Sequence, residues 1–187
     1  MIILDEFKQM LNIMLKPSSA TSSKTNFAKS SIFYYKATAI PFVLLLAFTF
    51  FIHNQITQSI DMLFEILIWL IIPLFALFET AVFQLSGKNF FSSFKHGSIN
   101  TFHSVLLSNS AIILVLWICV LYPPIAPILL GLAILWAFII LVTSLSVNQG
   151  ATRTEAFIAV VVGYLLMYLI INAIAIILVG QIPPPAA

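Results

Sequence analysis

The sequence predicts an all-α fold: a polytopic membrane helical bundle with five transmembrane helices, preceded by an amphipathic N-terminal helix. Composition is the first indication, because 61% of the 187 residues are hydrophobic and only 7% are charged, against about 25% charged residues in an average soluble domain. The second is that apolar stretches of about 20 residues, the length that a bilayer requires, recur five times along the chain. The third is the placement of the eight basic residues, which all fall on one side of the membrane when these stretches are taken as spans.

The basic residues also predict the orientation. Five lysines lie before the first span or in its first turn, two lie between the second and third, and Arg153 lies between the fourth and fifth. Because Lys and Arg in short loops are retained on the cytoplasmic side, we expect a cytoplasmic N-terminus and a C-terminus outside. Short loops and the lack of an N-x-S/T acceptor favour a prokaryotic plasma membrane as the location.

Residues 1–16 are expected to form an amphipathic helix on the inner membrane surface. Their apolar side chains recur with the spacing of one helical face, and charged residues interrupt the unbroken apolar core that a signal peptide would need. A helix docked on the underside of the bundle is an equally open alternative. Residues 17–32 are rich in Ser, Thr, Lys and Asn and are predicted to be a polar linker.

Residues 33–180 are predicted to form the five-helix transmembrane domain, and residues 181–187 a short outer tail. Only residues 122–124 join the third and fourth spans, so these two spans should form a tight antiparallel hairpin. Pro127 would then lie in a first helical turn, where its missing N–H is tolerated. The expected spans are residues 33–52, 62–85, 101–121, 125–147 and 156–179.

The start of the fifth span carries two local signals. Thr152 followed by Glu155 has the spacing of a capping box, in which each residue bonds to the backbone N–H of the other. Ala156, Ala159 and Gly163 then lie along one stripe of the helix. Since small residues let helix backbones approach closely in membranes, we expect this stripe to pack against another helix.

Five polar residues within the spans form a candidate intramembrane polar site, because polar groups facing lipid cost free energy. Glu65 and Glu79 lie fourteen residues apart in the second span and return to nearly the same helical face. One interpretation is a proton or cation path in which Glu79 and His103 are partners. The alternative is that both glutamates snorkel to the headgroups and pair locally. Asn109 and Asn172 are expected to bond to neighbouring helices.

Catalytic signatures are missing from the sequence. It contains no Walker-type glycine loop, no GxSxG elbow and no HExxH, and no nucleophile, base and orienting group can be assembled from its residues. Cys119, the single cysteine, lies in an apolar run and is interpreted as a small buried hydrophobe. We therefore expect no enzymatic activity, no cofactor, no metal and no nucleic-acid partner.

The connection between the second and third spans is the candidate contact region for lipid or for a partner protein. It combines basic and aromatic side chains, the usual anchors of a membrane interface. These residues are Lys88, Phe90, Phe91, Phe94 and Lys95.

The order of these features resembles the Yip family of Ypt-interacting proteins over about residues 10–179. The similarity lies in the glycine-containing connection 86–95, in Trp136 of the fourth span, and in the segments 144–147 and 152–156. The chain departs from the family at 107–110, where it has Leu-Ser-Asn-Ser and members often carry Ala-Tyr and then a proline. The resemblance implies five spans, an inside N-terminus, and a non-enzymatic role in binding proteins or shaping the bilayer.

Two functions of different class follow from these observations. The preferred one is a membrane scaffold or adaptor that binds a membrane or cytoplasmic protein, or organises the lipid bilayer, through its cytoplasmic face. The alternative is a small transporter or channel with a polar path involving Glu79, His103 and Asn109. Either function is compatible with a homo-oligomer.

Overall fold

The computed structural model describes residues 15–16, 35–36, 39, 62–121 and 123–179. Within these ranges the fold is all-α, as predicted. The expected amphipathic helix, polar linker, first span and outer tail fall almost wholly outside the described residues. The described elements are α3 (Met62–Phe90), α4 (Ser98–Leu121), the 3-10 helix η2 (Pro123–Ile125), α5 (Ala126–Gln149) and α6 (Arg153–Val179).

Three of these helices are long and apolar enough to cross a membrane. The segments that meet this criterion are Ser98–Leu116 in α4, Ala126–Gln149 in α5 and Arg153–Ile177 in α6. Each reaches the length of about 20 residues that spans a bilayer. The described part of the chain is therefore that of a helical membrane protein.

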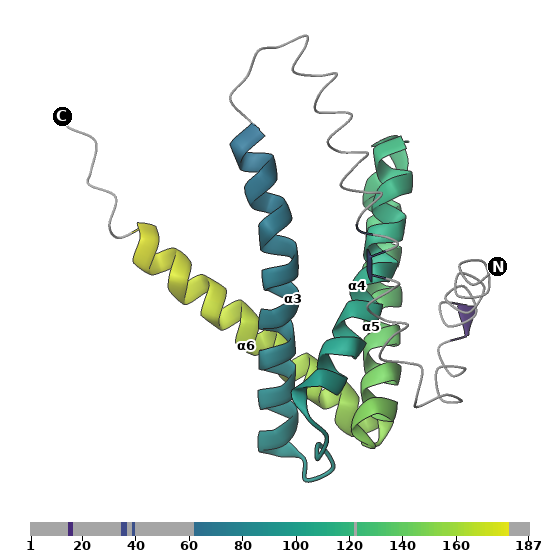
Figure 1. The fold of residues 1–187 in the computed structure, drawn as a ribbon, viewed down its shortest axis with the longest axis vertical. Coiled ribbons are helices and arrows are strands. Elements are labelled where there is room, and N and C mark those ends of the chain that lie inside the picture. The colour runs from purple at the N-terminus through teal and green to yellow at the C-terminus, as the bar shows by residue number, and fades with distance from the viewer. Residues whose placement is uncertain (1–14, 17–34, 37–38, 40–61, 122, 180–187) are drawn as a thin grey trace.

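The predicted hairpin of the third and fourth spans is confirmed. In Figure 1, α4 and α5 lie side by side, and η2 joins them at one end. Proline occupies the first turn of α5, where no intrahelical hydrogen bond from its nitrogen is needed. Small residues line the contact: Ala133 and Ala137 are buried, and Ser108 Oγ donates a hydrogen bond to Ala137 O over 2.9 Å. Close approach of the two backbones follows from this composition.

A second contact joins α6 to α3, which α6 crosses obliquely (Figure 1). Ser86 Oγ of α3 donates a hydrogen bond to Ala159 O of α6 over 2.8 Å. A Cβ at Gly163 would collide with the ring of Phe83, which is itself fully buried. Ala156 is fully buried as well. The predicted use of this small-residue stripe in close helix packing is confirmed.

The helix ends differ from the predicted span ends. α3 continues to Phe90 rather than ending at residue 85, α4 begins at Ser98 rather than 101, and α6 begins at Arg153 rather than 156. The reason is that backbone hydrogen bonding, not side-chain hydropathy, ends a helix, so α3 and α6 extend past their apolar runs at this end. The capping box is confirmed: Glu155 N donates to Thr152 Oγ1 over 3.2 Å, and Thr152 N donates to Glu155 Oε2 over 2.8 Å.

Candidate functional site

A hydrogen bond between side chains of α3 and α4 lies inside the bundle. Asn109 Nδ2 donates to Glu79 Oε2 over 2.8 Å, and the Glu79 side chain is only 6% exposed. A buried carboxyl group is costly unless hydrogen bonds satisfy it. The Asn109 amide supplies one such bond, so the prediction that Asn109 bonds to a neighbouring helix is confirmed.

The remaining members of the predicted polar site are His103, Glu65 and Asn172. His103 is 4% exposed in α4, nearly two turns before Asn109. Glu65 lies in α3, in the part of the helix whose side chains the structure does not describe. The expectation for Asn172 is wrong, because its Nδ2 donates to Tyr168 O of its own helix over 2.7 Å and its side chain is exposed. The reason is the oblique course of α6, whose second half diverges from α3 (Figure 1).

A second polar cluster, which the sequence analysis missed, joins α3, α4 and α5 near the α3–α4 connection. Gln149 is fully buried, and its Nε2 lies 3.1 Å from Gln84 Oε1 and 2.8 Å from Thr101 Oγ1. The Thr101 hydroxyl donates to Gln84 Oε1. We call these three residues the glutamine cluster. The sequence did contain a signal, since Gln84 lies at the end of one predicted span and Gln149 lies two residues beyond another. Their hydrogen-bond partners, however, are 17 to 65 residues away in the sequence.

The α3–α4 connection and α4 also cap the C-terminal end of α5. His96 Nδ1 lies 3.0 Å from Gln149 O, and because a carbonyl oxygen can only accept, this nitrogen carries the proton. Asn100 Nδ2 donates to Asn148 O over 3.2 Å. Gly150 ends the helix with a φ of 71°, a left-handed conformation that glycine adopts without steric cost. Terminal carbonyls that a helix leaves unpaired are satisfied here by another part of the chain.

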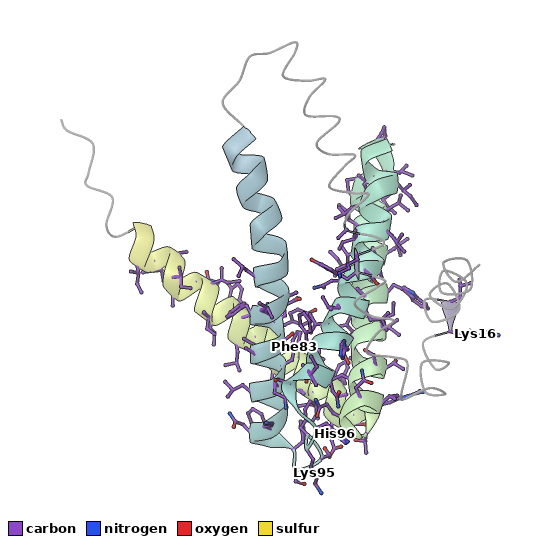
Figure 2. The ribbon with its side chains drawn as sticks, viewed as in Figure 1. Lys16, Phe83, Lys95 and His96 are labelled. Carbon is purple, nitrogen blue, oxygen red and sulfur yellow. The ribbon has the colours of Figure 1, made fainter. Side chains whose placement is uncertain are left out.

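The candidate contact residues divide into three exposed and two less accessible side chains. Lys88, Phe90 and Lys95 are exposed, and Phe90 keeps 62% of its surface. Figure 2 shows Lys95 and His96 at the end of the molecule where the α3–α4 connection lies. Phe91 is half-buried. The prediction that Phe94 lies on the contact surface is wrong, because this residue is only 3% exposed and belongs to the hydrophobic core.

Phe94 is buried because the connection folds back onto the last turns of α3. The ring of Phe94 lies against Gly87, where a Cβ would collide with it. Phe94 N also donates to Phe91 O over 3.3 Å, which tightens the turn. Gly87, in the last turn of α3, therefore allows this close approach of ring and backbone. Packing of Phe94 holds the connection against the bundle, while Lys88, Phe90 and Lys95 remain outside.

Among the described residues, no group of three His, Cys, Asp or Glu side chains could hold a metal ion. Cys119 is 7% exposed, which confirms its interpretation as a small buried side chain. Taken together, apolar helices, interhelical amide bonds and a basic, aromatic end define the class of helical membrane proteins. Comparison with known proteins adds no family: no family model, no curated protein and no solved structure matches the chain.

Proposed function

We propose that this chain is a non-enzymatic integral membrane protein that acts as a scaffold or adaptor through its cytoplasmic face. The observation that carries the proposal is the exposure of the Phe90 side chain, which lies between the exposed residues Lys88 and Lys95 in the sequence. Aromatic and basic anchors on a well-packed support are typical of surfaces that bind proteins or lipid headgroups. The packing of Phe94 on Gly87 provides that support.

The hydrogen bonds that several interior polar groups make favour binding over transport. Asn109 bonds to Glu79, Ser108 bonds to a carbonyl of α5, and Thr80 Oγ1 donates to Ala76 O over 2.7 Å. The first two of these bonds join different helices, and such interhelical bonds stabilise membrane bundles. Side chains that are hydrogen-bonded in this way stabilise the helical bundle rather than line a hydrated path.

The experiment is affinity purification of the tagged protein from its own membranes after chemical crosslinking, followed by mass spectrometry. In Phe90→Ser combined with Lys88→Gln and Lys95→Gln, recovery of a stoichiometric partner should fall roughly tenfold, the effect of about 1.4 kcal/mol. Arg153→Gln is the matched control, since it removes an exposed cation from α6 rather than from the connection. Equal recovery from both variants would count against the proposal.

The proposed membrane arrangement has five spans, a cytoplasmic N-terminus, an external C-terminus and a prokaryotic plasma membrane, as in a Yip-like protein. Three apolar helices and the basic residues near the α3–α4 connection support it. The test uses a Cys119→Ser background with a single cysteine at Lys88 or at Pro124. An impermeant thiol reagent added outside intact cells should label position 124 and not position 88, and the reverse pattern would overturn the orientation.

The second candidate is a small transporter or channel, favoured by the buried bond between Glu79 and Asn109. His103, in the same helix as Asn109, would extend the polar path. Glu79→Gln should then abolish a proton or cation flux in liposomes, since a carboxamide cannot release a proton. A flux that persists in this variant, or wild-type protein that conducts nothing, would remove this candidate.

A further inference from the structure

The side-chain oxygen of Gln149 differs from every other polar atom of the glutamine cluster. Its Oε1 is buried and has no hydrogen-bond partner among the described residues. The Nε2 atom of the same amide, by contrast, lies 3.1 Å from Gln84 Oε1, 2.8 Å from Thr101 Oγ1 and 3.4 Å from Gly97 O. The nitrogen of this fully buried amide therefore has three acceptors near it, whereas the oxygen accepts no hydrogen bond.

Exchanging the oxygen and nitrogen of this amide does not resolve the difference. The Gly97 carbonyl can only accept a hydrogen bond, and so can Gln84 Oε1. Gln84 cannot reverse its own amide without loss, because its Nε2 donates to His96 O over 3.1 Å. The nitrogen of Gln149 must therefore face the cluster, and the unpaired atom must be its oxygen.

An unpaired buried carbonyl oxygen costs free energy, and native proteins commonly satisfy such groups with ordered internal water. We propose that the glutamine cluster encloses a binding site for one small neutral hydrogen-bond donor, a water molecule that donates to Gln149 Oε1. This site does not depend on the proposed adaptor function.

Two features of the surroundings favour water over a cation. The cluster consists of uncharged groups, with no carboxylate among the side chains that hydrogen-bond within it. A cation buried without a counter-charge pays a large desolvation penalty, which a neutral donor does not. Gln149 is also the last residue of α5, next to the exposed residues His96, Gly97 and Gly150. Water can reach this end of the bundle without crossing the apolar interior.

The test is an experimental structure of the full chain in lipid nanodiscs, at a resolution that shows ordered water. We expect one density peak within hydrogen-bond distance of Gln149 Oε1. A protein donor on this oxygen, or an ordered cluster with no peak beside it, would overturn the proposal. Gln149→Met is isosteric and lacks the oxygen, so the peak should disappear in it. Gln84→Met is the matched control, because it removes an amide of the cluster and keeps Gln149 Oε1, and there the peak should persist.

The neutral character of the ligand has a separate measurement that needs no variant. Thermal unfolding of the wild-type protein is followed in sodium, potassium and choline chloride at equal ionic strength. We expect the same Tm in all three salts. A Tm that rises with sodium or potassium concentration, and that Gln149→Met makes insensitive to the ion, would replace water by a bound cation and overturn the proposal.

Discussion

Asn109 of α4 and Glu79 of α3 satisfy each other inside the bundle, through a hydrogen bond of 2.8 Å from Nδ2 to Oε2. The two residues lie thirty positions apart. Each would be costly against lipid or apolar side chains. Their pairing thus converts two unfavourable groups into a specific contact between neighbouring helices.

Asn109→Leu should lower the free energy of unfolding by about 1 kcal/mol, between the average of about 0.6 kcal/mol and the maximum of about 1.7 kcal/mol for interhelical hydrogen bonds in membranes. Glu79→Gln should cost less, because a carboxamide oxygen can accept the same bond. Unfolding in mixed micelles with increasing SDS measures both. Glu79→Ala, which removes the acceptor, completes the cycle: its loss and that of Asn109→Leu should not add in the double variant, whereas full additivity would show that the bond contributes nothing.

Gly163→Ala should destabilise the contact of α6 with α3 by about 1 to 3 kcal/mol, the usual cost of overpacking. The added Cβ would meet the buried ring of Phe83 and come within 3.4 Å of Ser86 Oγ. Gly131→Ala is the control in α5, since no atom lies within 4 Å of its Cβ position. It should leave stability unchanged or raise it by up to about 1 kcal/mol. Equal effects at the two glycines would contradict the close packing at Gly163.

Thr152→Ala should cost about 1 kcal/mol, because the first turn of α6 loses its side-chain cap. The hydroxyl accepts from Glu155 N over 3.2 Å and bonds to Glu155 Oε2 over 3.0 Å. Thr154→Ala removes an exposed hydroxyl from the same turn and serves as the control. Thermal unfolding of both variants, followed by circular dichroism, should separate them, and indistinguishable curves would argue against the cap.

Phe94→Ala should lower the free energy of unfolding by about 3 to 5 kcal/mol, as for other buried phenylalanines. Phe90→Ala should change it by no more than about 0.5 kcal/mol, as for an ordinary surface position. The difference arises because Phe94 is 3% exposed and Phe90 is 62% exposed. Protease resistance in detergent provides a second readout, and it should fall for Phe94→Ala alone.

Local features of this protein could be predicted from its sequence. Long apolar runs correspond to helices because only a helix satisfies its own backbone within lipid. The three-residue connection after α4 predicted its hairpin with α5, and the Thr152 and Glu155 spacing predicted the cap. Each of these features depends on residues a few positions apart, so the sequence of a short segment is enough to predict it.

Contacts between distant segments were decided by the tertiary structure. The sequence placed Phe94 among the surface anchors and Asn172 between helices, yet Phe94 packs on Gly87 and Asn172 bonds to its own helix. The glutamine cluster was not predicted at all, because its partners come from three different helices. Residue type and spacing determine whether a segment is a helix that can cross a membrane. Only the packing of helices against one another determines which side chains meet, because the same helical face can contact lipid, water or another helix.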